Sequence, residues 1–264
     1  MSRVSDPAVL VTGASSGIGR ATANRFHEAG WRVHATARDP TDLADLTARG
    51  CETHALDVTE DPDLSFLDGL DCLVNNAGFG QYGPLEGVPV ERLRRQFAVN
   101  LSGPHRLCRA ALPALCDAGG TVVSVSSLAA HAPFPGAGAY CASKAALEAH
   151  HDAMRAELLD RGVDVVLVQP GPVETGFRAR RERELAALSP STAYTDVYDR
   201  HRGETTRGAL FGETTADEVA DAVFAAAVSP DPPARLPVGW RVRAAITLSR
   251  FVPDAWRERV YEWL

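Results

Sequence analysis

The chain has 264 residues, of which 45% are hydrophobic and 23% are charged, and it carries a net charge of −7 at pH 7. This balance is typical of a soluble globular protein with a sizeable core, and the length suits a single α/β domain. The negative charge argues against a nucleic-acid surface, so the expected partner is a small molecule.

The five cysteines are odd in number, widely spaced and without a Cys-x-x-Cys pair, which suggests neither a disulfide framework nor a zinc knuckle. The sequence has no basic and apolar leader and no run of about 18 apolar residues, so we expect a cytoplasmic protein without a transmembrane segment. None of the eight histidines stands at a spacing typical of a metal site, and no metal is expected.

Short apolar runs alternate with longer stretches of helical period, which is the pattern of βαβ units in a mostly parallel sheet. Strands are predicted at residues 8–12, 32–37, 52–56, 72–75, 121–126, 164–169 and 235–238. Helices are predicted at residues 17–29, 90–118, 138–159 and 216–227. The most apolar strands must be buried on both faces, so helices should cover both sides of a doubly wound α/β sheet.

A glycine-rich turn follows the first predicted strand and opens the first predicted helix. Its glycines are Gly13, Gly17 and Gly19. Glycines at a strand-to-helix junction let backbone N–H groups approach a pyrophosphate, whose charge the helix dipole also favours. The turn therefore predicts a dinucleotide site.

The end of the second predicted strand bears on which dinucleotide binds. An acid there would accept a hydrogen bond from the ribose 2′-hydroxyl, whereas an arginine would hold a 2′-phosphate. In this chain Arg38 directly follows the predicted strand, and an arginine there favours NADP. In the alternative, Asp39 accepts the hydroxyl and Arg38 faces solvent, although Asp39 precedes Pro40 and is more typical of a turn or cap residue.

Tyr140 and Lys144 stand four residues apart in a predicted helix, which places a phenol and an ammonium on one face. A phenol titrates near pH ~10, and a nearby cation should lower that pKa. Taken alone, the pair also fits two solvated surface residues.

These motifs together resemble the short-chain dehydrogenase/reductase family, in the branch that includes steroid and retinol dehydrogenases and ketone reductases. Three further motifs stand in the family's order after the fourth, fifth and sixth predicted strands, at residues 75–78, 126–127 and 170–175. The resemblance implies one Rossmann-fold domain over residues 1–264, with a seven-stranded sheet. It also implies NADP(H)-dependent hydride transfer between a ketone or aldehyde and an alcohol.

The resemblance implies a role for each of four catalytic residues. Ser127, thirteen residues before the tyrosine, would orient the substrate oxygen, and Tyr140 would exchange the proton. Lys144 would bind the nicotinamide ribose, and Asn100 would kink a helix and hold a water. The plainer alternatives are a strand terminator for Ser127, a helix cap for Asn100 and a surface charge for Lys144.

The binding residues follow from the same resemblance. Expected cofactor contacts are Gly13, Ser15, Ser16, Gly17, Ile18, Gly19, Arg38, Asp57, Val58, Asn76, Ala77, Gly78, Tyr140, Lys144, Pro170, Gly171, Val173 and Thr175. Expected substrate contacts are Ser127, Phe79, Tyr82, Phe134 and Phe177. The aromatic residues suggest an apolar or aromatic substrate, although they would also fit an ordinary core.

The sequence leaves alternatives for the roles of two segments and for the oligomeric state. Residues 172–212 carry a mixed-charge run that is either a solvated helix face or part of a lid over the substrate. The carboxyl-terminal extension, residues 240–264, has aromatic residues among arginines; core packing is favoured over an oligomer contact, a pocket wall or a membrane-surface anchor. The alanine- and leucine-rich helices at 90–118 and 138–159 match the family's oligomer interfaces, so a homodimer or homotetramer is expected.

Two rival functions share parts of these motifs. A sugar-nucleotide epimerase or dehydratase can have the same tyrosine and lysine, but it usually has another glycine spacing and more chain after Gly171. A non-catalytic NADP-binding regulator should have a damaged catalytic set, whereas this set is complete.

Overall fold

The computed structural model describes residues 6–67, 69–174, 176–188, 192–195, 198, 212–253 and 256. Within them, seven parallel strands form one sheet in the order β3-β2-β1-β4-β5-β6-β7. The strands are β1 (Ala8–Thr12), β2 (Arg32–Ala37), β3 (Glu52–Ala55), β4 (Cys72–Asn75), β5 (Thr121–Val125), β6 (Asp164–Gln169) and β7 (Arg235–Pro237). All seven predicted strands are confirmed, and β3, β5 and β7 each end one residue earlier than predicted.

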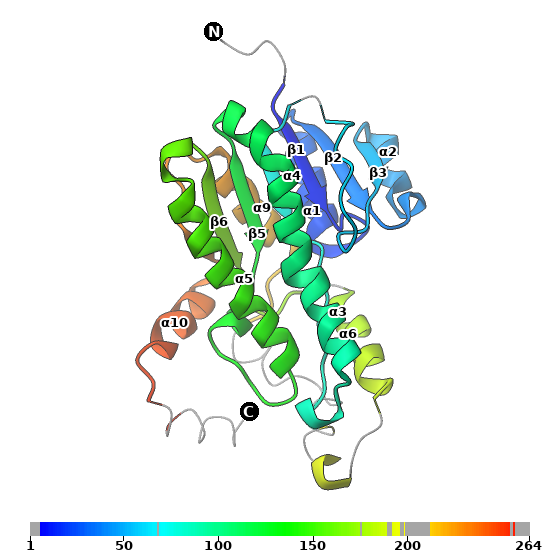
Figure 1. The fold of residues 1–264 in the computed structure, drawn as a ribbon, viewed down its shortest axis with the longest axis vertical. Coiled ribbons are helices and arrows are strands. Elements are labelled where there is room, and N and C mark those ends of the chain that lie inside the picture. Colours follow the sequence, from blue (N-terminus) through cyan, green and yellow to red (C-terminus); the bar gives the residue numbers. More distant parts are fainter. Residues whose placement is uncertain are drawn as a thin grey trace.

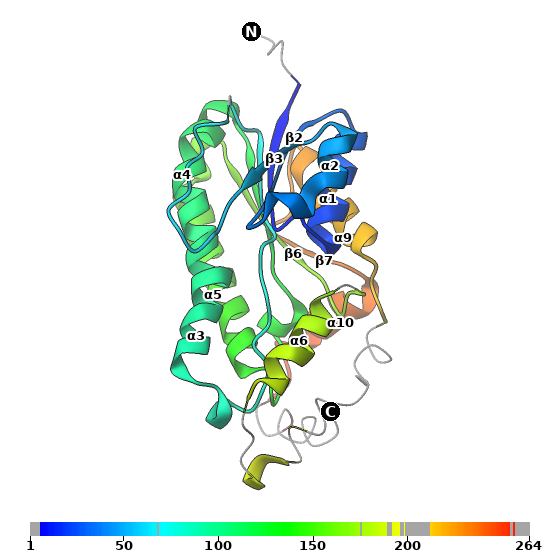
Figure 2. The ribbon, with the colours of Figure 1, turned by 90° about the vertical axis from the view of Figure 1, so that its right-hand side faces the viewer.

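Helices cover both faces of the sheet, as the doubly wound fold requires. The helices are α1 (Gly17–Glu28), α2 (Ala44–Arg49), α3 (Val90–Phe97), α4 (Gly103–Ala118), α5 (Gly138–Glu157), α6 (Phe177–Ala186), α9 (Ala216–Val228) and α10 (Trp240–Ser249). Seen along the sheet, α3, α4 and α5 lie on one side and α1, α2 and α9 lie on the other (Figure 2). Helices α6 and α10 lie past the carboxyl ends of the strands (Figure 1).

The two layers of the core follow from the alternation of side chains along each strand. On β1, Val9 and Val11 pack into the cluster beneath α1 and α9, whereas Leu10 packs into the cluster beneath α4 and α5. All five residues of β1 are buried. Because β2 lies on one side of β1 and β4 on the other, the strand order reverses at β1, and this reversal opens a crevice beyond the carboxyl ends of the strands.

The predicted helix at 90–118 is interrupted, which corrects the single long helix expected from the sequence. Helix α3 is followed by a π-helical turn, Ala98–Ser102, and then by α4. Pro104 lacks the N–H group that would donate to the carbonyl of Asn100 in a continuous α-helix, so the ladder cannot run through. A π-helical turn that contains Asn100 thus lies where a kink is expected.

Helices α2 and α10 had no predicted counterpart, and α6 falls on the run that was expected to be either a solvated helix face or part of a lid. Helix α2 has only six residues, too few for a clear period. Helix α6 contains the mixed-charge run, whose charged residues hide the narrow apolar face that ends in the buried Leu185.

The carboxyl-terminal extension is only partly packed into the core. Val242 and Ile246 of α10 are buried against Leu128, but Trp240 is 75% exposed and Phe251 is 77% exposed. Core packing is therefore wrong for these exposed aromatic residues. The stretch after residue 256 lies outside the described residues, and among the described residues no helix is long and apolar enough to cross a membrane.

Candidate functional site

A cleft of about 1300 Å³ lies at the carboxyl ends of the strands. The turn after β1, the ends of β2, β4, β5 and β6, and helices α6 and α10 all contribute to its walls. It contains almost every residue that the sequence singled out. Gly19 and Asn100 do not line it, and Thr175 and the side chains of residues 178, 179 and 181 lie outside what the structure describes.

The glycine-rich turn has the backbone that a dinucleotide site needs. Gly13 and Gly17 have φ angles of 66° and 53°, in the left-handed region that favours glycine. Helix α1 begins at Gly17 without a side-chain cap bond from Ser16 and without an acidic residue in its first turn. Its first N–H groups and its dipole are therefore available to an anion.

Gly19 and Asn76 support the glycine-rich turn from outside it. A Cβ atom at Gly19 would collide with the carbonyl of Gly13 and the side chain of Asn76. Asn76 Nδ2 donates to the carbonyl oxygens of Thr12 (2.8 Å) and Gly13 (3.2 Å). Gly19 thus lets α1 pack closely, and Asn76 fixes the turn to the end of β4.

Arg38 and Asp39 line the cleft where β2 ends. Asp39 is the N-cap residue of the next short helix: its Oδ1 accepts hydrogen bonds from the backbone N–H (2.9 Å) and the hydroxyl (2.6 Å) of Thr41. These bonds hold the pKa of Asp39 below its usual value. Arg38 is exposed and makes no hydrogen bond or ion pair with the described residues, so its guanidinium is available to a ligand.

Asp57 both caps the end of β3 and lines the cleft. Its Oδ1 caps the chain after β3 by accepting from Thr59 N (2.9 Å) and Thr59 Oγ1 (2.7 Å). Asp57 and the neighbouring Val58 line the cleft as well. The strand-end cap is therefore present, and it fixes a carboxylate at the cleft wall.

Asn100 connects two loops of the site although it does not reach the cleft. It is 1% exposed, its Oδ1 accepts from Phe79 N (3.2 Å), and its Nδ2 donates to Phe79 O (3.0 Å). Nδ2 also lies 3.1 Å from Ser143 Oγ on α5. The π-helical turn thereby holds the segment after β4 against the helix that carries Tyr140 and Lys144.

Ser127, Tyr140 and Lys144 meet at the end of β5. The side chain of Ser127 hydrogen-bonds the phenol of Tyr140, and Lys144 Nζ donates to the carbonyl oxygen of Val125 at 2.7 Å. Tyr140 and Lys144 are 8% and 6% exposed, so the alternative of two solvated surface residues is wrong. Both side chains line the cleft.

The pKa values of the pair differ from the expectation. Burial raises the pKa of Tyr140 above its ordinary value, and the neighbouring Tyr82 adds to that rise, whereas the hydrogen bond from Ser127 opposes it. Burial lowers the pKa of Lys144 to about 8, against the attraction of Glu148. Burial outweighs the hydrogen bond from Ser127, so the pKa of this phenol lies above its ordinary value rather than below it.

Lys144 is the only lysine in the chain, and every other basic side chain of this type is an arginine. Arginine stays protonated in proteins, whereas a buried lysine can lose its proton near neutral pH. A single lysine among arginines therefore indicates a position where an ammonium with a lowered pKa is needed. The prediction from the sequence rests only on the spacing of the motif and does not use this signal.

A buried carboxylate supports the same helix, and sequence reasoning missed it. Glu148 accepts hydrogen bonds from Ser126 Oγ (2.7 Å), Gln169 Nε2 (2.7 Å) and Arg235 Nε (2.8 Å), and lies 3.3 Å from His131 Nε2. Burial alone would raise the pKa of Glu148, but the hydrogen bonds outweigh it and lower the pKa to about 2. The network joins β5, β6 and β7 to α5 behind the cleft.

The wall of the cleft around Tyr140 is largely aromatic. The ring of Tyr140 stacks on Tyr82 (centroids 5.8 Å apart) and lies 5.7 Å from Phe177 of α6. Phe134 lies 6.3 Å from Tyr82, and Phe79 follows the turn after β4. Ala245, Leu248 and Val252, in and after α10, also line the cleft, so a pocket wall, one of the alternatives for the carboxyl-terminal extension, fits these residues better than the favoured core packing.

Four arginines also line the cleft: Arg38 after β2, Arg95 of α3, and Arg180 and Arg183 of α6. Arg95 of α3 and Arg180 of α6 lie over the ring of Phe79, at 5.1 Å and 5.0 Å. Burial and the charges of Arg38 and Arg95 lower the pKa of Arg180. Such a group of like charges at a cleft favours an anionic ligand.

The mixed-charge run lies in helix α6, which borders the cleft. Phe177 and Arg180 line the cleft, while Glu184 pairs with Arg92 (3.1 Å) and Arg95 (3.6 Å) of α3. One side of the helix thus forms a cleft wall, and the ion pairs connect it to α3.

The comparison with protein families decides the identity of this arrangement. The model of the short chain dehydrogenases matches residues 7–186. The chain belongs to this family. As a short-chain dehydrogenase it is an oxidoreductase, and its fold is one that binds a nicotinamide cofactor.

Two of the similar proteins match nearly the full length of this short-chain dehydrogenase, and a third matches about two thirds of it. An uncharacterized oxidoreductase of Escherichia coli K12, YbbO, is 33% identical over 98% of this chain and 96% of its own. A short-chain dehydrogenase crystal structure from Streptomyces avermitilis is 32% identical, with a TM-score of 0.80 over 99% of this chain and 97% of that one. An NADPH-dependent 1-acyldihydroxyacetone phosphate reductase of Schizosaccharomyces pombe is 38% identical over 65% of this chain and 62% of its own.

Proposed function

We propose that this short-chain dehydrogenase interconverts a ketone or aldehyde and the corresponding alcohol, with NADP(H) as its cofactor. The observation that carries the proposal is the meeting of Ser127, Tyr140 and Lys144 in one cleft. Two hydroxyl groups in contact can both donate to one carbonyl oxygen, where negative charge gathers during reduction.

Tyr140 is the proposed general acid of carbonyl reduction. Because burial raises its pKa, the phenol holds its proton at neutral pH and can donate it to the developing alkoxide. Ser127 orients the same oxygen through its hydroxyl. NADPH, when bound, supplies the hydride from its C4 atom, and the protein positions and polarises the carbonyl.

Lys144 is proposed to hold the nicotinamide ribose and a positive charge beside the phenol. Its pKa of about 8 keeps most of the ammonium protonated at pH 7. Its bond to Val125 O anchors the ammonium at the end of β5. Asn100 acts at a distance, because it fixes α5 and the segment after β4 relative to each other.

The cofactor site fits NADP better than NAD. Residue 37 is an alanine, the carboxylate of Asp39 is engaged with Thr41, and the guanidinium of Arg38 faces the cleft. The 2′-phosphate would therefore meet Arg38 rather than an acid. The NADPH dependence of the fission-yeast relative supports the same choice.

The substrate is proposed to be apolar or aromatic. Phe177 offers apolar surface next to Tyr140, and Leu248 adds apolar surface to the wall of the same cleft. The fission-yeast relative is named for a substrate with an acyl chain, which is consistent with such a wall.

NADPH consumption tests the proposed function. Absorbance loss is followed across a panel of ketones and aldehydes, including aromatic and long-chain members, with NADH in parallel. We expect turnover with at least one apolar carbonyl compound and a preference for NADPH. Cofactor binding without turnover across the panel would instead indicate a regulator, and conversion of a sugar nucleotide without net NADPH loss would indicate an epimerase.

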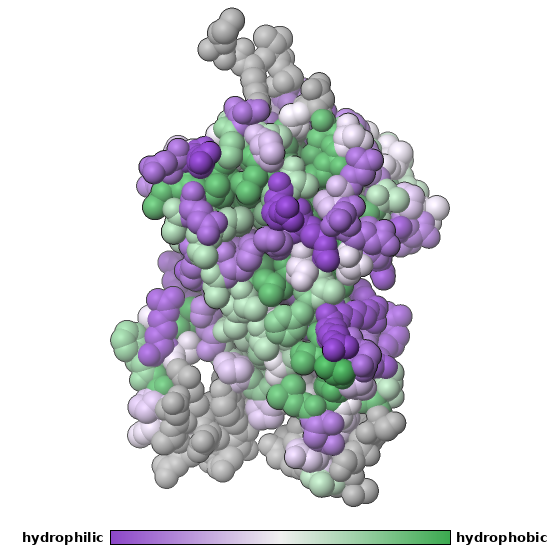
Figure 3. Space-filling model, in the orientation of Figure 1, coloured by the Kyte–Doolittle hydropathy of each residue, from purple (hydrophilic) through white to green (hydrophobic). Residues whose placement is uncertain are grey.

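We also propose a homodimer or homotetramer formed through α4 and α5. Near-neutral and hydrophobic side chains occupy the middle of the face over these helices (Figure 3). On α5, Ala142, Ala145 and Ala149 are exposed at spacings of three and four residues, which would let a second helix approach closely. Light scattering after size-exclusion chromatography should give a mass of two or four chains, and Ala145→Arg should reduce it.

A further inference from the structure

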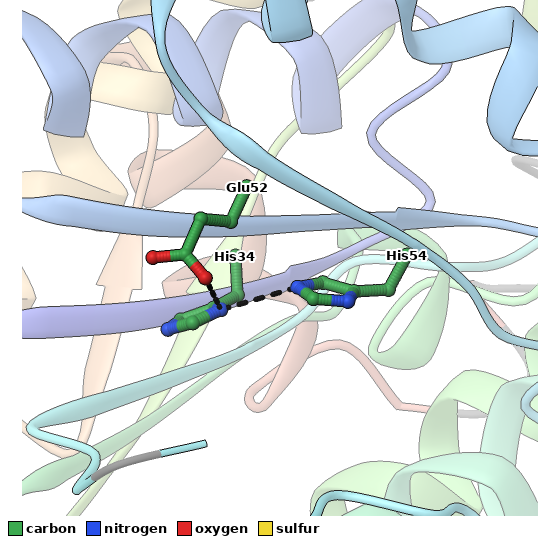
Figure 4. Close-up of side chains that lie close together, drawn as sticks. All are labelled: His34, Glu52 and His54. Atoms are coloured by element: carbon green, nitrogen blue, oxygen red, sulfur yellow. Dashed lines mark hydrogen bonds and ion pairs between the residues drawn. The ribbon is translucent and has the colours of Figure 1, made fainter. Parts of the chain in front are cut away.

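A cluster of two histidines and one glutamate lies at the edge of the sheet, outside the cleft (Figure 4). His34 comes from β2, and Glu52 and His54 come from β3. Glu52 is the register partner of His34, and His54 follows two residues later on the same face of the strand. The parallel pairing thereby brings to His34 two side chains that stand 18 and 20 residues later in the sequence.

The three side chains converge on one atom, His34 Nδ1. His54 Nε2 lies 3.2 Å from it, and Glu52 Oε2 lies 3.5 Å from it. All three ligand atoms lie within 4.8 Å of one another. Two ligand atoms on a tetrahedral ion with bonds of about 2.0–2.1 Å stand roughly 3.3–3.4 Å apart, so the two distances to His34 Nδ1 suit one shared ion.

His34 needs a strong partner at this atom. Its side chain is 1% exposed in a strand whose neighbours are apolar, and burying an imidazole is costly unless it is bonded. Its other nitrogen, Nε2, has no hydrogen-bond partner. The polar contacts of this buried ring are therefore concentrated on the side where His54 and Glu52 approach.

A hydrogen bond between the two imidazoles is the simpler explanation of the 3.2 Å contact. It uses one proton between His34 and His54, and it leaves the Glu52 carboxylate at a long 3.5 Å. A metal ion would use all three ligand atoms at once. It would also gain from the stacking of His54 on Phe66, at 3.7 Å and 15°, which holds that ring in place.

We propose that His34, Glu52 and His54 form a binding site for a divalent transition-metal ion such as Zn²⁺. Two imidazoles and a carboxylate are ligands that Zn²⁺ accepts, with water in the fourth position. Glu52 is 49% exposed, so the ion can enter from solvent on that side. The site could not be recognised from residue spacing in the sequence, because its ligands come from two strands rather than from one helix.

The role of this ion is structural. None of the three ligands lines the cleft, so the ion would not meet the substrate. Strand β3 is the four-residue edge strand and pairs only with β2. An ion shared by β2 and β3 would fasten this edge, just before Asp57 and Val58 enter the cleft wall.

Zinc titration of the untagged protein tests the site. After dialysis against a chelator, Zn²⁺ binding is measured by calorimetry, and thermal unfolding is followed with and without Zn²⁺. We expect one ion per chain and a rise in Tm of about 5 °C or more once Zn²⁺ is about a hundredfold above its Kd. Co²⁺ should give the visible absorption of a low-symmetry, four-coordinate site.

Matched variants locate the ion. Glu52→Gln keeps the shape of an exposed side chain, and we expect it to weaken Zn²⁺ binding by at least ~10-fold; His54→Gln should do the same or more. The control is the double variant His105→Gln/His150→Gln, which removes a different pair of neighbouring histidines, with ring nitrogens 3.0 Å apart on α4 and α5. That control should bind Zn²⁺ like the parent.

Two results would overturn the proposal. One is an unchanged Tm and no calorimetric signal in the parent protein. The other is loss of binding in the His105/His150 control together with full binding in Glu52→Gln and His54→Gln. Because every readout is binding or unfolding, neither result depends on the proposed oxidoreductase reaction.

Discussion

The two ends of the cleft are built in different ways. At the cofactor end the wall is backbone and short polar side chains at strand ends, such as Gly13, Ser15 and Asp57, held by bonds into the sheet. At the substrate end it is made of large side chains from helices outside the sheet, such as Phe177 and Leu248. The first end has to match a fixed ligand, whereas the second can change residue by residue without disturbing the sheet.

This contrast makes a general prediction. Substitutions at the cofactor and proton-transfer end should affect every substrate equally. Substitutions at the helical end should change one substrate relative to another. Four measurements can break or sharpen the distinction.

The largest effect is expected for Tyr140→Phe. Removing the phenolic hydroxyl should lower kcat by at least ~100-fold for every carbonyl substrate, while NADPH binding stays close to that of the parent, because the general acid is lost and the ring remains. Single-turnover kinetics and NADPH fluorescence titration measure the two quantities. Tyr82→Phe is the control, because it removes the hydroxyl of the ring stacked on Tyr140. Near-normal turnover of Tyr140→Phe would remove the proposed proton donor.

The same contrast explains how much could be predicted from the sequence. Strands buried on both faces leave continuous apolar runs, so all seven were found within one residue of their ends. The turn at Gly13 and Gly17 was found because a positive φ and a close ligand admit few residue types. The cofactor end can be recognised from sequence motifs because the backbone geometry there restricts the choice of residue.

The remaining parts of the site depend on contacts between distant segments. Glu148 is an ordinary helical glutamate in the sequence, and only the fold brings Ser126, Gln169 and Arg235 to it. The same is true of Arg180 in α6, whose charged run fits a solvated helix equally well. Such groups carry no local pattern, so periodicity and spacing could not assign them.

Arg38→Asp tests the proposed contact with the 2′-phosphate at the cofactor end of the cleft. A charge-assisted contact with the 2′-phosphate contributes ~1.5–3 kcal/mol, so the ratio of kcat/KM with NADPH to that with NADH should fall by ~10–100-fold. The fall should be the same for every substrate. Arg49→Asp makes the same charge change on the exposed end of α2, outside the cleft, and should leave the ratio unchanged. An unchanged ratio in Arg38→Asp would refute the 2′-phosphate assignment.

Lys144 allows a test of stability against function. Its pKa of about 8 lies below the ordinary value of 10.5, so burial of the ammonium costs up to ~3 kcal/mol while the residue is protonated in the folded state. Lys144→Met should lose activity and yet raise the free energy of unfolding at pH 7 by ~1–3 kcal/mol. Because the folded pKa is lowered, this gain should be full below pH 8 and should disappear as the pH rises toward 10.5.

Urea unfolding at several pH values measures the gain, and the single lysine offers a direct check. In protein labelled only in lysine, the side-chain NMR signal should titrate near pH 8. Lys144→Arg keeps the buried charge and should not be stabilised. A titration near the ordinary lysine value, with no gain in Lys144→Met, would mean that the ammonium is solvated.

The smallest effect separates the two ends most directly. Phe177→Ala removes an apolar ring beside Tyr140, and an apolar side chain of this size contributes ~1.5–3 kcal/mol when it is fully covered. The substrate covers only part of the ring, so KM for an aromatic ketone should rise by ~10-fold, with a much smaller change for a short aliphatic aldehyde. Phe251→Ala is the matched control, since that ring is 77% exposed and does not line the cleft. If Phe177→Ala lowered kcat/KM for all substrates by one common factor, α6 would belong to the catalytic end, and the contrast between the two walls would fail.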